Sequence, residues 1–299
     1  MLIGLLLIAL AALSWGTTGS VTTILVTHHG AEPLVIGLAR MALAAAVLLA
    51  AARLGHGSLH IARADLGRCV LMGACMATFQ AAYFTAVVMT GIAVTALLAI
   101  CSAPLMIAVL AAAVLGERLS ARILLALGLG VGGTALLVGG HAGLATGPRL
   151  AGGAGLALTA GLAYALYVIT AKVSLARSAP LPLTGLSFTA AALIMAPVLT
   201  WSTAPLEQLA RGWPWLLYLG VVTTAAAYAA YTSGLCRVPA TVAGIVTLLE
   251  PLTATLLGVL AFGEPLGALG GLGALALLAA IGLLGAQLNQ AGSPARRPG

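Results

Sequence analysis

Charged side chains are scarce in this sequence, since only 6% of its 299 residues are Asp, Glu, Lys or Arg. A soluble globular domain carries roughly one quarter charged residues, so this composition excludes a protein whose surface lies mostly in water. Cysteine is also rare, and the four residues (Cys69, Cys75, Cys101 and Cys236) have neither paired nor metal-type spacing. We therefore expect them to be packing residues and not a disulfide framework.

Hydrophobic residues make up 62% of the chain instead, and the mean hydropathy is +1.15. Apolar runs of about 20 residues, the length that crosses the hydrocarbon core of a bilayer, recur along the whole sequence. Backbone polar groups in lipid must be bonded within their own segment, so we expect membrane-spanning helices and an all-α protein. The ten predicted spans are 3–25, 33–54, 66–88, 92–115, 122–139, 150–171, 182–201, 213–234, 239–261 and 266–288.

No segment is left over for a soluble domain, because the longest break, 53–65, holds only 13 residues. The N-terminal run lacks a basic region and is too long for a signal-peptide core, so we expect it to remain as the first span. We expect the tail, residues 291–299, to be disordered.

The thirteen basic residues give a net charge of +7. They are spread singly between the spans, without the basic tract of a nucleic-acid-binding protein, so no nucleic-acid partner is expected. With a cytoplasmic N-terminus, only Arg149 and Arg211 lie on the outer side, as the positive-inside rule predicts. Both termini are then cytoplasmic, and the inner side holds Arg53, Arg63, Arg68, Arg118, Arg122, Lys172, Arg177, Arg237, Arg296 and Arg297.

An internal repeat relates CSAPLMIAVLAAAVLGERLS (101–120) to LLEPLTATLLGVLAFGEPLG (248–267). Since each predicted half, 1–145 and 146–290, holds five spans, the second half must enter the membrane from the opposite side, as in inverted-topology transporters. The residues that match at a single offset of 147 are Pro104 with Pro251, Gly116 with Gly263, Glu117 with Glu264, and Leu119 with Leu266.

These two Pro...Gly-Glu spans, the Ser14-Trp15-Gly16 sequence and the ten-span duplication resemble the EamA-type carriers of the drug/metabolite transporter superfamily, most of all the YddG-type amino-acid exporters. The resemblance implies a basket of spans one to four and six to nine around a central cavity, with spans five and ten outside it. It also implies export of a small metabolite across the bacterial inner membrane by alternating access. The acid that couples protons in the first span of small multidrug members is absent, since Trp15 and its neighbours are uncharged.

Glu250 lies in the middle of the apolar run 239–261. A charged side chain at that depth costs about 2.5 to 3.5 kcal/mol on insertion scales, so it should face protein or water. The next residue, Pro251, cannot donate to the Thr247 carbonyl and tends to kink the helix. The equivalent residue in the first half is Pro104, so we predict a hinge at both prolines and an acid in only one half.

Two interpretations of Glu250 are open: contact with substrate or an ion, or a structural pair with a neighbour. Arg40 is the natural cationic partner, because it lies near the same depth in span 33–54. The alternative for Arg40 is a snorkelling side chain whose guanidinium reaches the outer interface.

Polar and aromatic side chains near mid-membrane are candidates for the cavity wall or, alternatively, for hydrogen bonds between helices. Pairs three residues apart share one face of a helix. With Trp15, these candidates are Gln80 and Tyr83, Tyr164 and Tyr167, and Tyr228 and Tyr231.

Two pairs of glycines have the small-xxx-small spacing that lets membrane helices approach closely: Gly128 and Gly132, and Gly267 and Gly271. We expect them to serve packing within each half, with a dimer contact as the alternative. The protein is therefore expected to be a monomer or a weak homodimer.

Signals of enzymatic chemistry are missing from the sequence. The five histidines lie in predicted loops without a ligand cluster, and no nucleophile–base pair or phosphate-binding glycine loop can be placed. We expect no metal, no cofactor and no enzymatic activity.

A cavity with one acid, one base, hydroxyls and aromatic faces suits a zwitterion with an apolar side chain. The leading hypothesis is an exporter of amino acids, aromatic and other neutral ones, and of related small metabolites. A multidrug or lipophilic-cation exporter is the first alternative, and a non-transporting membrane scaffold is the second. The expected partners are a small-molecule substrate and the lipid bilayer.

Overall fold

A computed structural model describes residues 1–56, 61–139, 148–262 and 267–291, and within these ranges all regular structure is helical. The expected tail, the boundary between the predicted halves, and Gly263, Glu264 and Leu266 lie outside the described residues. The elements are α1 (Leu2–Gly16), α2 (Thr18–His29), α3 (Pro33–His56), α4 (Arg63–Thr90), α5 (Ile92–Leu115), α6 (Ala121–Gly139), α7 (Pro148–Ser174), α8 (Pro180–Met195), α9 (Val198–Trp201), α10 (Pro205–Arg211), α11 (Trp213–Leu217), the π-helix η1 (Tyr218–Ala226), α12 (Ala227–Leu235), α13 (Ala240–Val246), α14 (Leu249–Phe262) and α15 (Ala268–Ala291).

Nine helical segments of the described chain are long and apolar enough to cross a membrane, and each corresponds to one of the first nine predicted spans. The tenth predicted span corresponds to α15, in which the apolar stretch Ala268–Leu284 is shorter. Leucines on the outside of the bundle, such as Leu6 and Leu10 of α1, are exposed. Helices that are apolar on all faces are typical of proteins surrounded by lipid. The chain is a multi-pass membrane protein.

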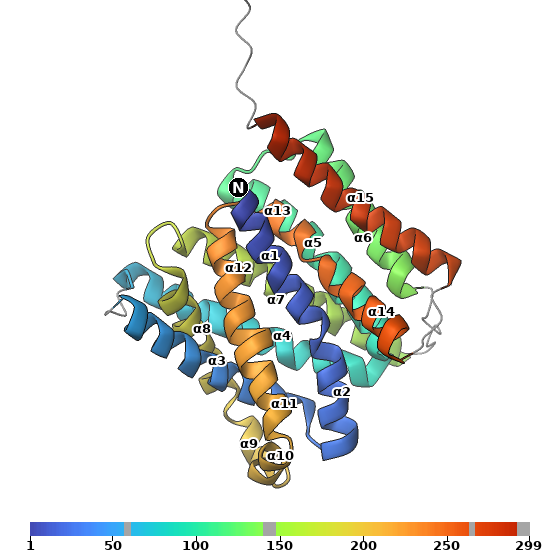
Figure 1. Cartoon of the computed structure of the whole chain (residues 1–299). Helices are drawn as coiled ribbons and strands as arrows, with labels where there is room; N and C mark the ends of the chain where they lie inside the picture. The colour runs from blue at the N-terminus through green and yellow to red at the C-terminus, as the bar shows by residue number, and fades with distance from the viewer. Residues whose placement is uncertain (57–60, 140–147, 263–266, 292–299) are drawn as a thin grey trace, which may run out of the picture.

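Successive spans run in alternating directions, so the bundle has two ends (Figure 1). The N-terminus and the last turns of α15 lie at one end, which we call the Met1 end. The C-terminal end of α2, together with α10, lies at the other, which we call the His29 end.

Two of the spans are broken near their middle by residues that are not helical. Helix α1 ends at Gly16, where the hydroxyl and the amide of Thr17 both bond the Ser14 carbonyl, at 2.8 and 3.2 Å. The second interruption separates α13 from α14, just before Pro251. Each break supplies irregular backbone at mid-membrane depth, which is tolerated where protein or a cavity covers it.

Helices from the two ends of the sequence intermix. Helix α4 packs on α7, α3 on α8, and α1 on both α12 and α14. Helices α6 and α15 form a separate pair along one side of the bundle (Figure 1).

The glycine pairs predicted from their spacing do not make the close approach between helices. A Cβ atom added at Gly128, Gly132, Gly267 or Gly271 meets no described atom within 4 Å. The close approach of α6 to α15 occurs instead on the neighbouring face of α6. There a Cβ added at Gly133 would lie 2.7 Å from the Gly273 carbonyl oxygen. The expected packing within each half is therefore wrong for these four glycines, because they point away from the helix pair.

Candidate functional site

A cavity of about 760 Å³ begins in the middle of the bundle and extends toward the His29 end. Its deep part is formed by the middle of α3, α4, α5 and α7 and by the breaks after α1 and α13. Its wider part is lined by α2 and by the His29-side ends of α4 and α14. Helix α6 contributes only Leu137 and Val138 to the wall, and no described residue of α15 contributes.

Most residues predicted for the site line this one cavity. They come from seven helices, although they are scattered over the sequence. Those that line it are Trp15, Arg40, Gln80, Tyr83, Pro104, Tyr164, Tyr228, Glu250 and Pro251.

Tyr167 and Tyr231 do not line the cavity but pack directly behind its wall. Both are fully buried. The Tyr231 ring lies 5.3 Å from the ring of Trp15, and the Tyr167 ring stacks on Tyr164 at 6.3 Å. The spacing of three residues put each pair on one helix face, but that face is wide enough for one ring to reach the cavity and the other to support it.

Trp15 is the centre of an aromatic cluster at the deep end of the cavity. Its ring lies 4.8 Å from Tyr228 and meets Tyr164 edge to face at 6.5 Å. Such pairs stabilise by about 0.5 to 1.5 kcal/mol beyond their buried area. We call this cluster the aromatic floor of the cavity. The indole Nε1 of Trp15 and the amide nitrogen of Gln80 donate to no described residue. These two hydrogen-bond donors therefore have no partner among the described residues.

Glu250 lies in the first turn of α14, where the partial positive charge of a helix N-terminus favours an acidic side chain. The side chain is half-buried and borders the cavity. No described residue forms an ion pair or hydrogen bond with its carboxylate. Of the two interpretations of this residue, the structural pair therefore has no partner among the described residues.

Arg40 turns into the protein and is only 8% exposed. Its Nε donates a 3.0 Å hydrogen bond to the hydroxyl of Thr224 in η1. The side chain therefore does not extend to the membrane interface, as the snorkelling alternative required. Arg40 and Glu250 interact electrostatically across the cavity, but they are not joined by an ion pair.

The break before Pro251 agrees with the kink expected from the sequence. The Thr247 carbonyl, which Pro251 cannot serve, accepts the amide of Glu250 at 3.0 Å. The freed carbonyl is thus satisfied by the residue that carries the acid. In the first half, α5 runs unbroken through Pro104, so the interruption is not duplicated. Loss of one backbone hydrogen bond alone does not end a helix that is packed along its length.

At the Met1 end, Glu117 joins the segment after α5 to the start of α13. Its carboxylate accepts hydrogen bonds from the Ala240 amide at 2.6 Å, the Thr241 amide at 3.1 Å and the Thr241 hydroxyl at 2.8 Å. Free amides at a helix N-terminus are a natural site for a carboxylate. The Gly-Glu repeat drew attention to Glu117, but its partner could not be deduced from the sequence.

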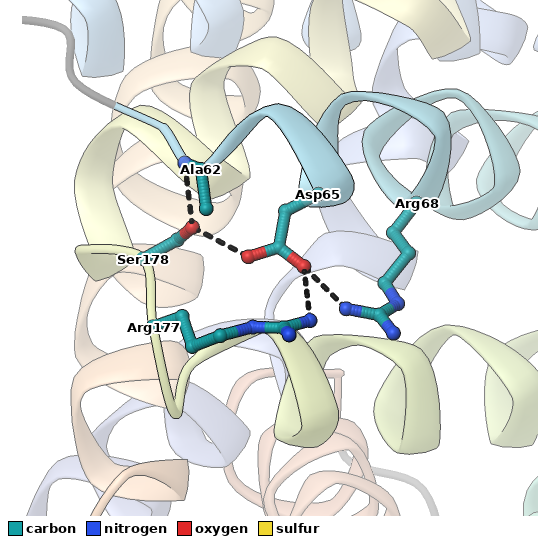
Figure 2. A network of polar contacts seen from close by, with 5 residues as sticks. All are labelled: Ala62, Asp65, Arg68, Arg177 and Ser178. Carbon is teal, nitrogen blue, oxygen red and sulfur yellow. Dashed lines mark hydrogen bonds and ion pairs between the residues drawn. The ribbon is translucent and has the colours of Figure 1, made fainter.

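A second carboxylate, Asp65, joins α4 to the segment between α7 and α8 at the same end (Figure 2). Asp65 is fully buried and accepts from Arg68 at 2.5 Å, Ser178 at 2.7 Å and Arg177 at 3.3 Å. The Ala62 amide donates to Ser178 in turn, at 3.4 Å. This cluster was not predicted from the sequence, in which a lone aspartate in the first turn of a span was the available signal. Both carboxylates thus link separate helical segments at the Met1 end.

Within the described residues no three His, Cys, Asp or Glu side chains lie close enough to hold a metal ion. The polar groups that line the cavity can form hydrogen bonds or carry charge, so the site can bind and orient a small molecule.

Comparison with known proteins agrees with this architecture. A transporter of Bacillus subtilis (strain 168), named uncharacterized transporter YwfM, is 33% identical over 267 residues, which is 87% of this chain and 86% of that protein. An uncharacterized transporter of Archaeoglobus fulgidus is 30% identical over 152 residues, 51% of this chain and 52% of that protein. One crystal structure aligns with a TM-score of 0.80 over 97% of this chain and 99% of its own, at 20% identity, which shows likeness of fold alone.

The family model described as the EamA-like transporter family matches the chain twice, over residues 2–139 and 151–286. The two matches together span almost all of the helices described above. The two transporters that it resembles agree with that assignment. The chain is a membrane transporter and belongs to the EamA-like transporter family.

Proposed function

We propose that this transporter exports amino acids, aromatic and other neutral ones, and related small metabolites across the bacterial inner membrane, as YddG-type exporters do. The observation that carries the proposal is the cavity in which Glu250 and Arg40 face the same space without forming an ion pair. A single acid and a single base with an aromatic floor match a zwitterion that has an apolar side chain.

The ammonium group of the substrate is assigned to Glu250, which lacks a described protein partner. A ring or alkyl side chain is assigned to the aromatic floor of Trp15, Tyr164 and Tyr228. Aromatic faces also attract a cation, by about 0.5 to 2 kcal/mol, and add to the binding of the ammonium group.

Alternating access is supported by the asymmetry of the two ends. The cavity reaches the His29 end, whereas Glu117 and Asp65 hold the Met1 end together. With a cytoplasmic N-terminus, this arrangement is the outward-facing one. Export then requires a second arrangement in which the Met1 end opens and the His29 end closes.

An inverted repeat is supported by the pattern of packing. Exchanging each of the first five spans with its counterpart in the second half turns the α4–α7 contact into the α12–α1 contact. The same exchange turns α5–α7 into α14–α1, and it leaves the α3–α8 and α6–α15 pairs unchanged. Two equivalent halves of opposite orientation supply the two mirrored arrangements that alternating access needs.

Export of lipophilic cations is the second candidate, because Glu250 and the aromatic floor would bind a cation without help from Arg40. The two candidates differ in whether the substrate needs a carboxylate. A scaffold without transport differs from both, because replacing Glu250 would leave its behaviour unchanged.

The proposal is tested with the purified protein in liposomes that contain labelled L-phenylalanine. We expect saturable efflux that falls roughly tenfold in Glu250→Gln, the loss of about one hydrogen bond to a charged group. Tyr83→Ala should weaken efflux by a smaller factor, because it removes an uncharged side chain from the lining of the cavity. Glu207→Gln is the matched control, since Glu207 is exposed, pairs with Arg211 and does not line the cavity. Undiminished efflux in both cavity variants contradicts the proposal, and efflux of a lipophilic cation alone supports the second candidate.

A further inference from the structure

The π-helix η1 (Tyr218–Ala226) interrupts the span that runs from α11 to α12. π-Helical turns are rare and frequently occur at functional sites, because the wider turn repositions side chains that an α-helix would place elsewhere. Here it faces α3, and the two are very close. A Cβ added at Gly220 would lie 2.6 Å from the Cβ of Leu43. The π-helix thus lies directly beside the helix that carries Arg40.

Two buried threonines of η1 share one acceptor. The Thr223 hydroxyl donates to the Leu219 carbonyl at 3.0 Å, and the Thr224 hydroxyl donates to the same oxygen at 2.7 Å. A hydroxyl has a single proton to donate, so the oxygen of Thr224 is left to act as an acceptor. It accepts the Nε hydrogen of Arg40 at 3.0 Å. The hydrogen bond to the Leu219 carbonyl therefore fixes the orientation of the Thr224 hydroxyl, whose oxygen accepts the hydrogen bond from Arg40.

This contact uses one of the five N–H groups of the guanidinium. No described residue accepts a hydrogen bond from either terminal nitrogen of Arg40. Arg40 lines the cavity, whereas Thr224 does not. When a hydrogen bond occupies Nε of a guanidinium, its two terminal nitrogens remain available. Their forked geometry matches the two oxygens of a carboxylate.

We propose that Arg40 is the subsite for the carboxylate of the transported zwitterion, and that Thr224 is the residue that positions it. The proposal rests on the proposed function and adds to it the orientation of the substrate: carboxylate toward α3, ammonium toward Glu250 of α14. It also assigns specificity, because an amine without a carboxylate leaves the terminal nitrogens of the buried guanidinium without a hydrogen-bond acceptor.

The first experiment measures competition in liposomes that transport labelled L-phenylalanine. Unlabelled L-phenylalanine and L-phenylalaninamide compete at a pH that keeps both amines protonated, and the ratio of their inhibition constants is the preference for the carboxylate. We expect the wild-type protein to prefer the acid. Thr224→Val should lower that preference about tenfold through a weaker apparent affinity for the acid, because the charge-assisted hydrogen bond that orients Arg40 is lost. Thr224→Ser, which keeps the hydroxyl, should restore it.

Thr223→Val is the matched control. Thr223 lies in the same π-helix, is equally buried and bonds the same carbonyl, but it does not contact Arg40. A merely structural role of the η1 hydroxyls predicts equal changes in both valine variants. A change of preference in Thr224→Val alone assigns the effect to Arg40.

The second experiment separates this subsite from the proposed function. Thermal stabilisation of the protein in detergent is measured with phenylacetate and with phenylacetamide, which differ only in the carboxylate. Absence of phenylalanine transport, together with a Thr224-dependent preference for phenylacetate, overturns amino-acid export and supports the subsite. Equal stabilisation by the two compounds, or an unchanged preference in Thr224→Val, overturns the subsite even where phenylalanine is transported.

Discussion

Glu32, between α2 and α3, is a charged residue outside the membrane-spanning segments whose hydrogen bonds can be tested by changing pH. Its carboxylate accepts from Gln208 at 3.0 Å and from Ser202 at 2.8 Å. These bonds, first that of Gln208, hold the pKa of Glu32 below its ordinary value. Since the folded pKa lies below the unfolded one, this stabilisation is complete above the unfolded pKa and is lost as pH falls through the folded pKa.

We therefore expect the melting temperature of the protein in detergent to fall with acidification, and part of that fall to be missing in Glu32→Gln. The comparison variant is Glu207→Gln, whose exposed ion pair with Arg211 should contribute little. Identical melting curves for Glu32→Gln and wild type across the acidic range would contradict the assigned role of Glu32.

Asp65 gives a second prediction for a single side chain. Asp65→Asn keeps the shape but removes the charge that Arg68 and Arg177 share. We expect a loss of about 1 to 3 kcal/mol in the free energy of unfolding, because one buried acceptor becomes a donor beside two cations. Ser178→Ala should cost less, about 1 kcal/mol, since it removes a neutral donor. Denaturant melts in detergent measure both, and a neutral Asp65→Asn would be inconsistent with the cluster.

The charged residues of the cavity, Arg40 and Glu250, were only partly predictable from the sequence. Their position near the middle of apolar runs follows from the sequence, and so does the expectation that they face protein or water. The partner of Arg40 could not be predicted, because Thr224 is 184 positions away and lies in a π-helix that no spacing rule indicates. The geometry of these side chains was therefore not predictable.

For whole helices, the sequence predicts which segments form spans better than it predicts where those spans are interrupted. Apolar runs predicted the spans that the described chain contains, and Pro251 predicted the break between α13 and α14. The break after Gly16 and the π-helix were not predicted, because they depend on tertiary contacts. One of these is the hydrogen bond between Thr17 and Tyr218, 2.8 Å long, which links residues 201 positions apart.

The α6–α15 pair provides a prediction on packing between elements. Gly133→Ala should destabilise the protein by about 1 to 3 kcal/mol, because the added methyl group meets the backbone of α15. Gly128→Ala on the same helix is the matched control. It meets no described atom within 4 Å and should be neutral or stabilising, by up to about 1 kcal/mol, through helix propensity. Equal melting temperatures for the two variants would contradict the packing described above.

For the whole molecule, Glu117 tests the proposed alternating access. Glu117→Ala removes the carboxylate that bonds the start of α13, so under that proposal the arrangement in which the Met1 end is held together should become less populated. Spin labels at Arg118 and Arg237, both exposed at this end, should then report a larger population at long distances. Labelled protein with Glu117 intact is the reference, and an unchanged distance distribution would argue against a closing role.

The hydrogen bonds of Glu117 to α13 determine which substitutions at positions 117 and 240 preserve this contact. Two of its three donors are main-chain amides, which every amino acid except proline provides. The contact therefore depends on an acidic side chain at position 117. At position 240 the amide is kept by every residue except proline, and only the size of the side chain is restricted, because Ala240 is fully buried.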